Sequence, residues 1–290
     1  MPEPSSIVVL GGPAAGKTVY LSILYHHLWD GHDGMVMRAG SGAMHSELLG
    51  LAESIGKGTM PPATQALRHF EFELQHEARI YHLQYLDYPG ELFRKVFYDM
   101  TIDSDEAREL LSICETAAGV LVLVDPRSVV DAGREMDYAL SNLFRFYESK
   151  PVCPQFVFAF TKRDQNQDLV GDHLASFVKR RLPHVARLLG RGMRLMHFSS
   201  IIKSKQSVQF ARPMAVRAAL DAILEAIEEQ QIDKARVAFM RRLAVKSALT
   251  KAGWFLCILI SVLCAFLIGV FLRHIVEVHR SASELPGTTG

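Results

Sequence analysis

Cysteine is scarce in this chain, which has only four in 290 residues. None of them forms a C-x-x-C pair, so the sequence offers no disulfide framework and no zinc site, and it indicates a reducing compartment. An excess of charge of one sign is also missing. The formal net charge is +1, which gives no indication of nucleic-acid binding. The first six residues contain no lysine or arginine, so they do not predict a signal peptide.

A glycine-rich loop follows the first apolar run of the chain. Residues 11–18 read Gly-Gly-Pro-Ala-Ala-Gly-Lys-Thr and match G-x-x-x-x-G-K-[ST] at every fixed position. The loop lies between an expected strand, residues 7–10, and an expected helix, residues 19–29. In that setting backbone N–H groups surround a phosphate, a lysine reaches the outer phosphates and a threonine hydroxyl binds Mg²⁺. The expected nucleotide contacts are Gly11, Ala14, Ala15, Gly16, Lys17, Thr18 and Val19.

A second motif follows a pair of expected strands. Residues 70–74 alternate apolar and charged side chains and residues 80–86 form another extended run, which predicts an antiparallel pair at a sheet edge. The second strand leads into residues 87–91, Asp-Tyr-Pro-Gly-Glu, which match D-x-x-G. We expect Asp87 to hold Mg²⁺ and the backbone N–H of Gly90 to approach a γ-phosphate.

A third motif ends a buried strand. Residues 119–124 and 156–160 are continuous apolar runs, which are typical of parallel strands covered on both faces. The second run ends in residues 161–164, Thr-Lys-Arg-Asp, close to the pattern N/T-K-x-D. Guanine presents two adjacent donors that one carboxylate can accept, so Asp164 favours guanine over adenine. The stem of Lys162 can pack along the face of the base.

The segments between these motifs are less regular. Residues 31–66 have weak periodicity, and residues 48–55 predict a short helix within them. A helical insert is expected at residues 168–189 and a last strand at residues 194–198. Residues 213–230 predict a final amphipathic helix. The last strand is followed by the expected base-contacting residues Ser199 and Ser200.

Taken in this order, the motifs resemble those of Ras-like P-loop GTPases of the translation-factor-related class. Residues 16–21, Gly-Lys-Thr-Val-Tyr-Leu, and residues 87–93, Asp-Tyr-Pro-Gly-Glu-Leu-Phe, are similar to prokaryotic double-GTPase-type proteins, which occur beside partner GTPases and effectors. The resemblance implies an α/β fold, a mostly parallel sheet with helices on both faces. It implies GTP or GDP as the ligand, with guanine held by Thr161, Lys162 and Asp164. It implies Mg²⁺ at Thr18, Asp87 and a switch threonine, for which Thr64 is preferred and Thr59 is the alternative.

Departures from the family pattern concern hydrolysis. Glu91 occupies the position at which many relatives carry a water-positioning glutamine, and its negative charge predicts slow intrinsic hydrolysis. The expected catalytic set is Lys17, Thr64, Gly90 and Glu91. Arg68 and Arg94 lie near the switches but are interpreted as surface residues. The role of residues 31–58 stays open.

A long apolar run lies near the end of the chain. Residues 252–272 carry no charge, and a helix of this length reaches about 31 Å, enough to cross a bilayer. Basic residues are more frequent before the run than after it, which predicts a cytoplasmic GTPase domain and a non-cytoplasmic tail at residues 273–290. Residues 232–251 predict a basic juxtamembrane helix. Small residues at every fourth position predict association with another transmembrane helix: Gly253, Cys257, Ser261, Ala265 and Gly269.

These patterns predict a GTPase domain at residues 1–231, attached to a membrane by one helix. The expected function is a membrane-anchored molecular switch that binds GTP, hydrolyses it slowly and controls an effector or a second GTPase. One alternative is a nucleotide-binding membrane scaffold with little or no hydrolysis, which Glu91 favours. The other is an ATP-using P-loop enzyme, against which Asp164 argues.

Overall fold

The protein is described by a computed structural model. The structure describes residues 6–77, 79–148, 150, 153–166, 172–188, 194–203, 207–237 and 239–240. The chain divides into two compact units, Met1–Gln230 and Gln231–Gly290. All three nucleotide motifs lie in the first unit, so the fold of that unit positions the site.

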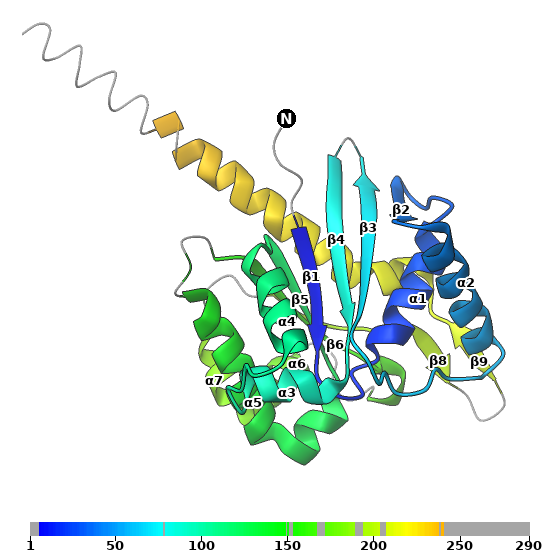
Figure 1. The fold of residues 1–290 in the computed structure, drawn as a ribbon. Coiled ribbons are helices and arrows are strands. Elements are labelled where there is room, and N and C mark those ends of the chain that lie inside the picture. The colour runs from blue at the N-terminus through cyan, green and yellow to red at the C-terminus, as the bar shows by residue number, and fades with distance from the viewer. Residues whose placement is uncertain are drawn as a thin grey trace, which may run out of the picture. The chain divides into compact units, whose positions relative to one another are not determined.

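One twisted sheet runs through the first unit (Figure 1). Its described part has seven strands in the order β2-β3-β4-β1-β5-β6-β7. Neighbours from β4 to β7 are parallel, whereas β2 pairs with β3 and β3 with β4 in antiparallel fashion. The predicted α/β class with a mostly parallel sheet is therefore confirmed. The strands are β1 (Ser6–Gly11), β2 (Met35–Ala39), β3 (Arg68–His76), β4 (Arg79–Asp87), β5 (Gly119–Val124), β6 (Gln155–Phe160) and β7 (Arg194–His197).

Helices cover both faces of this sheet, and the side chains of β1 point alternately to one face and the other. Ile7 and Val9 pack in one apolar cluster with α1, α2 and the helix at residues 213–230, whereas Val8 and Leu10 pack in a second cluster with α3 to α7. Every β1 side chain from Ile7 to Leu10 is buried, which explains why the sequence of this strand is a continuous apolar run with no alternation. The helices are α1 (Lys17–Leu28), α2 (Gly42–Gly56), α3 (Gly90–Phe97), α4 (Asp105–Glu115), α5 (Pro126–Glu148), α6 (Asp172–Arg181) and α7 (Pro183–Leu188).

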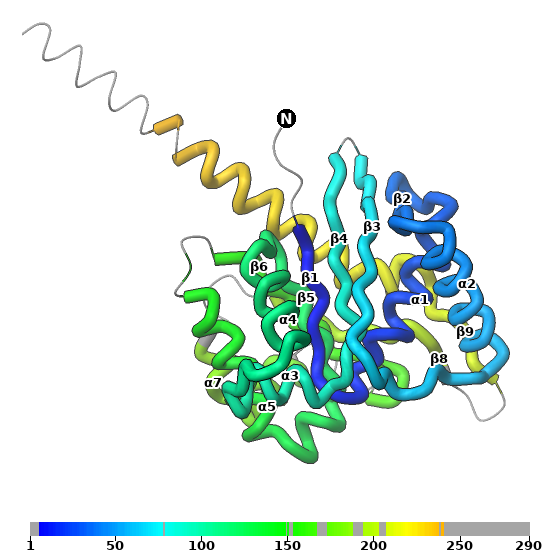
Figure 2. The backbone as a smooth tube through the Cα atoms, in the orientation of Figure 1, coloured from blue at the N-terminus to red at the C-terminus, as the bar shows by residue number. Residues whose placement is uncertain are grey.

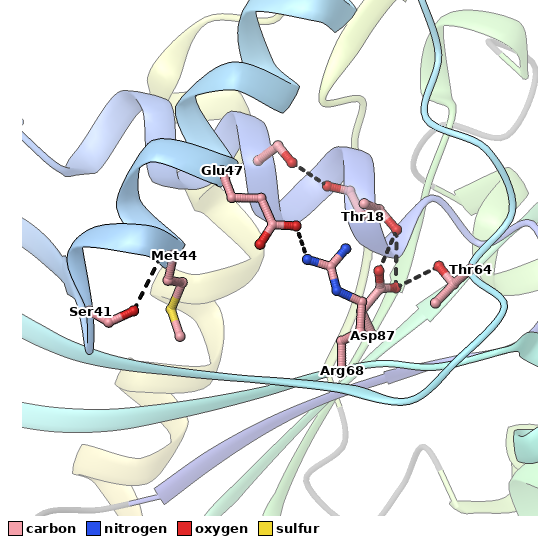
Figure 3. Close-up of polar contacts among 8 residues, drawn as sticks. Thr18, Ser41, Met44, Glu47, Thr64, Arg68 and Asp87 are labelled. Carbon is pink, nitrogen blue, oxygen red and sulfur yellow. Dashed lines mark hydrogen bonds and ion pairs between the residues drawn. The ribbon is translucent and has the colours of Figure 1, made fainter.

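The segment between α1 and β3 differs from the prediction. β3 and β4 do form an antiparallel pair, from Arg68 opposite Asp87 to His76 opposite Arg79. The expectation that this pair forms the sheet edge is wrong, because β2 pairs along the outer side of β3. The helix expected at residues 48–55 is also longer. It begins after Ser41, whose hydroxyl accepts a hydrogen bond from the backbone N–H of Met44 at 3.2 Å (Figure 3).

Two further predictions about the second half of the unit need correction. The expected last strand, β7, is followed by a hairpin of β8 (Ile201–Lys203) and β9 (Val208–Phe210). Phe210 of β9 packs against Gly56 at the end of α2, so α2 covers the hairpin. The helical insert expected at residues 168–189 contains two helices, and Pro183 begins the second of them.

The helical residues 213–230 pack against the sheet, and residues 227–230 lie near the first residues of several strands. Glu228 pairs with Arg79 at the start of β4 at 3.1 Å. Gln230 donates a side-chain hydrogen bond of 3.0 Å to the carbonyl of Cys153, two residues before β6. A Cβ at Gly119, the first residue of β5, would lie 2.7 Å from the side-chain Cδ1 of Ile227, so the helix lies close to the start of β5. Residues 227–230 of this helix therefore lie at the amino edge of the parallel strands.

The second unit is described only at residues 231–237 and 239–240, which are helical. The predicted transmembrane helix at residues 252–272 and the tail at 273–290 lie outside the described residues. Within the described part of the chain, no helix has the length and apolarity to cross a bilayer.

Candidate functional site

A cavity of about 370 Å³ lies at the opposite, carboxyl edge of the parallel strands. The lower ends of β1 and β4 in Figure 2 lie side by side, where the chain turns into α1 and α3. The cavity collects segments that are far apart in the sequence. It is lined by residues 13–19 after β1, residues 60–64 before β3, Asp87, Tyr88, Gly90 and Glu91 after β4, Thr161, Lys162, Asp164 and Gln165 after β6, and Ser200 and Ile201 after β7.

The loop between β1 and α1 has the backbone that an anion-binding turn requires. Gly16 has φ of 78°, in the left-handed region, and forms the N-cap of α1. Ala14 also has a positive φ of 55°. These reversals turn successive N–H groups of the loop toward the start of α1, where the helix dipole favours negative charge. Ala14, Ala15, Gly16 and Val19, all predicted ligand contacts, line the cavity.

Lys17 is buried at the base of this loop. Its Nζ donates hydrogen bonds to the carbonyls of Gly11 at 3.0 Å and Gly12 at 3.3 Å. Burial lowers the pKa of Lys17 from 10.5 to about 8, although the nearby carboxylates of Asp87 and Glu91 act in the opposite direction. A phosphate would supply the opposite charge that this buried ammonium lacks.

Three predicted metal residues meet at one carboxylate (Figure 3). Thr18 Oγ1 donates to the two oxygens of Asp87 at 3.0 and 3.1 Å, and Thr64 Oγ1 donates to Asp87 Oδ1 at 3.1 Å. Thr59, the alternative switch threonine, lies instead at the end of α2, where its N–H donates to the carbonyl of Ser54. The geometry therefore favours Thr64 for that role.

These oxygens suit a hard cation. One carboxylate and two hydroxyls from three separate segments converge within hydrogen-bond distance, and Mg²⁺ takes few protein oxygens while keeping water and phosphate as its other ligands. The residues present therefore fit Mg²⁺.

The D-x-x-G segment touches the phosphate loop directly. A Cβ placed on Gly90 would lie 2.3 Å from the Cα of Pro13, so no other residue fits at this position. Gly90 begins α3 and Glu91 lies in its first turn, exposed at the cavity. Glu91 therefore lies beside Gly90 at the wall of the cavity.

The other end of the cavity gathers the predicted base-binding residues. Ser199 Oγ donates to the Asp164 carboxylate at 2.8 Å and accepts from the Asp164 N–H at 2.8 Å. Thr161 is buried, and its N–H donates to the carbonyl of Val124 at 2.9 Å. Ser200 lines the cavity beside Ile201, whereas Ser199 acts by holding Asp164.

Sequence reasoning missed two residues of this site. Asp125 is buried and forms an ion pair of 2.5 Å with Lys162, which fixes the lysine stem at the cavity wall. Its position directly after the buried strand β5 was the available signal, because the carboxyl ends of parallel strands share one edge. The other is Tyr88, whose hydroxyl hydrogen-bonds to the backbone of Gly11. Nothing in the D-x-x-G pattern specifies that residue.

The two candidate arginines are engaged elsewhere. Arg68 forms an ion pair with Glu47 of α2 (Figure 3), and Arg94 pairs with Glu135 of α5 at 3.6 Å. Neither lines the cavity, and no arginine is present among the described residues that do. Their interpretation as residues outside the catalytic set is consistent with these positions.

Solved structures to which the chain is similar share little sequence with it. The Arl6 BBS3 small GTPase of Trypanosoma brucei, with bound nucleotide analogue GppNp, is 14% identical, with a TM-score of 0.42 over 78% of this chain and 99% of its own. A putative nucleolar GTP-binding protein 1 of Plasmodium falciparum is 12% identical, with a TM-score of 0.41 over 85% and 97%. Roco2 of Methanosarcina barkeri bound to GDP is 12% identical, with a TM-score of 0.39 over 78% and 50%.

No curated protein matches the chain. A family model does match, over the part of the chain that contains the phosphate loop, the Thr18–Asp87–Thr64 cluster and Gly90. That model describes the Double-GTPase 1 family and matches residues 8–149, just under half of the chain, and together with the cavity it supports a P-loop GTPase.

Proposed function

We propose that this protein is a membrane-anchored molecular switch that binds GTP with Mg²⁺ and hydrolyses it slowly. The observation that carries the proposal is the meeting of Thr18, Thr64 and Asp87 within 3.0 to 3.1 Å at the mouth of the phosphate loop. Thr18 lies at the start of α1, Thr64 in the loop before β3 and Asp87 at the end of β4. A glycine-rich turn that binds no ligand would not require side chains from three separate segments to converge.

We propose a role for each side chain of the cavity. The loop N–H groups and Lys17 bind the β- and γ-phosphates, while Thr18, Thr64 and Asp87 hold Mg²⁺, which neutralises charge on the phosphates when bound. Gly90 presents its N–H to the γ-phosphate, and Glu91 orients the attacking water. Because Thr64 and Gly90 lie on separate segments that both reach the γ-phosphate, its loss releases both segments.

The base end favours guanine. Asp164 accepts from the two adjacent donors of guanine, and Ser199 holds the carboxylate in place at 2.8 Å. Lys162 packs its stem on the base while Asp125 fixes its ammonium. Adenine lacks that pair of donors and would leave the carboxylate unmatched.

A second candidate function is a nucleotide-binding scaffold with little or no hydrolysis. Glu91 favours it, because an exposed carboxylate at the cavity adds negative charge beside the γ-phosphate. Single-turnover phosphate release distinguishes a slow enzyme from a scaffold.

We further propose that residues 252–272 anchor the switch in a membrane with the GTPase domain on the cytoplasmic side. Ile232, Phe239 and Met240 of the preceding helical segment are exposed, and such side chains together with basic residues suit a bilayer surface. The partner is an effector or a second GTPase on another chain. The stripe of small residues from Gly253 to Gly269 adds association with another transmembrane helix, in the same protein or in a partner.

Nucleotide titration tests the core of the proposal. A fluorescent GTP analogue should bind the full chain in detergent micelles, and Lys17→Ala should abolish binding while the domain stays folded. Competition should rank GTP well above ATP. Binding by Lys17→Ala with unchanged affinity would refute the phosphate site, and equal competition by ATP would refute the guanine assignment.

A further inference from the structure

The strands β1 and β4 separate before they end. Their parallel pairing runs from Ser6 opposite His82 to Val9 opposite Tyr85, yet β1 continues to Gly11 and β4 to Asp87. Backbone groups of Gly11 that would continue the β1–β4 ladder need another partner, because buried N–H and C=O groups are costly to leave unpaired.

Tyr88 supplies that partner. Its hydroxyl accepts a hydrogen bond from the Gly11 N–H at 3.0 Å and donates one to the Gly11 carbonyl at 3.1 Å. The side chain is 1% exposed, so water cannot replace these bonds. One phenol therefore binds both polar groups of the residue at which the phosphate loop begins.

The ring of Tyr88 also faces the catalytic lysine. Lys17 Nζ lies 4.4 Å from the ring centroid, the geometry of a cation–π contact, and it bonds to the same Gly11 carbonyl that Tyr88 holds. A cation–π contact strengthens when water is excluded, as it is around this buried lysine. Gly90, two residues after Tyr88, contacts Pro13 on the other side of the loop. The D-x-x-G segment thus contacts the phosphate loop at two points, Gly11 through Tyr88 and Pro13 through Gly90.

We propose that Tyr88 is a positioning residue for nucleotide binding: it fixes Gly11 and orients Lys17, so that the phosphate loop is formed before the ligand arrives. This inference rests on the proposed function. A preformed loop binds more tightly because less conformational entropy is lost on binding. The bonds of Tyr88 also join the phosphate loop to the first residues of the D-x-x-G segment.

Removal of one oxygen atom tests the proposal. Tyr88→Phe keeps the ring and loses both bonds to Gly11. Tyr85→Phe is the matched control, because Tyr85 is also fully buried on β4 and its hydroxyl has no hydrogen-bond partner among the described residues. We expect Tyr88→Phe in the full chain to bind a fluorescent GTP analogue about tenfold more weakly than the parent, and Tyr85→Phe to match the parent. Affinities are compared well below the unfolding temperatures of all three proteins, so that lost stability does not count as lost binding.

A spectroscopic measurement without nucleotide separates positioning from folding. In protein labelled with ¹³C at the lysine ε-carbon, the Tyr88 ring should shift the Lys17 signal upfield, and Lys17→Arg identifies that signal. We expect the signal to stay upfield in Tyr85→Phe, to broaden in Tyr88→Phe as Lys17 loses its fixed pose, and to return to the ordinary lysine position in Tyr88→Leu.

The outcomes separate the two proposals. If the parent binds no GTP, the proposed function fails whatever the lysine spectrum shows. If the parent binds GTP and Tyr88→Phe binds it as well as Tyr85→Phe does, Tyr88 has no positioning role. An upfield Lys17 signal that persists in Tyr88→Leu would equally overturn the inference.

Discussion

At the scale of single residues, Lys17 carries a charge that the fold disfavours. Its pKa falls from 10.5 to about 8 because the side chain is buried. Between these values the unfolded chain binds more protons than the folded one, so the free energy of unfolding rises with pH across that window. We predict a gain of at most about 3 kcal/mol in the nucleotide-free protein. This gain is measured from the denaturant midpoints at the two ends of the pH window, in the parent and in Lys17→Met. An equal gain in Lys17→Met would assign the effect to other groups.

The same charge makes nucleotide binding pH-dependent with the opposite sign. Phosphate binds the protonated lysine, so affinity for GTP should fall as pH rises above the pKa of about 8. Below that pH the lysine is charged and its contribution to affinity is complete.

Asp164 governs the choice of base. Asp164→Asn replaces one acceptor by a donor, which mismatches the N2 amino group of guanine and suits the corresponding oxygen of xanthine. We predict that GTP affinity falls roughly a hundredfold while xanthosine triphosphate loses far less or gains. Competition between the two nucleotides on the same protein measures the ratio. An unchanged preference for GTP would mean that residues 161–164 form an ordinary turn.

At the scale of elements, the insertion of β2 and α2 is tied to the segment that carries Thr64. Glu47 of α2 pairs with Arg68 at the start of β3 (Figure 3), while the N–H of Thr59 bonds back to Ser54 of α2. The loop between them is therefore held at both ends by one helix.

We predict that Glu47→Gln loosens this loop. A half-exposed pair contributes no more than about 1 kcal/mol to stability, so the unfolding temperature should hardly move. Cleavage by thermolysin between residues 59 and 67 should become several-fold faster. Glu53→Gln is the control, because it removes a pair with Lys57 within α2 itself. Equal cleavage of the two variants would show that the Glu47–Arg68 pair does not restrain the loop.

The elements that sequence could predict are those with an unambiguous local pattern. β1, β5 and β6 are uninterrupted apolar runs, and β1 and β6 each end in a motif that needs a strand before it. β2 escaped prediction because Met35 and Met37 are buried while the partly exposed Val36 between them is equally apolar, so no alternation is visible. The hairpin of β8 and β9 has three-residue strands that depend on contact with α2.

The site was predictable wherever a motif names the residue. Asp125 and Tyr88 could not be derived in that way, because their partners lie 37 and 77 residues away in the chain. From the sequence, Thr64 was preferred but Thr59 stayed an alternative, and it is the fold that brings Thr64 to Asp87.

At the scale of the whole molecule, two cationic side chains are among the described residues that line the cavity, Lys17 and Lys162. Lys162 lies at the base end, so Lys17 is the lining cation that would lie beside the γ-phosphate near Glu91. We predict that the purified protein releases phosphate in a single turnover far more slowly than the roughly 1–100 s⁻¹ typical of kinases, and that Glu91→Gln is faster. A partner that supplies an arginine in trans should accelerate the parent. Fast release by the parent alone would contradict this assignment of Glu91.

The position of the 213–230 helix has a mechanical consequence. Ile227 and Glu228 contact the first residues of β5 and β4, and Gln230 bonds to Cys153 ahead of β6, whereas the nucleotide motifs follow the last residues of β1, β4 and β6. The six-residue strands β5 and β6 hold these two edges about 20 Å apart. A force applied through residue 231 would load strand starts and leave the phosphate loop unstrained, so tension on a tether should not expel the nucleotide.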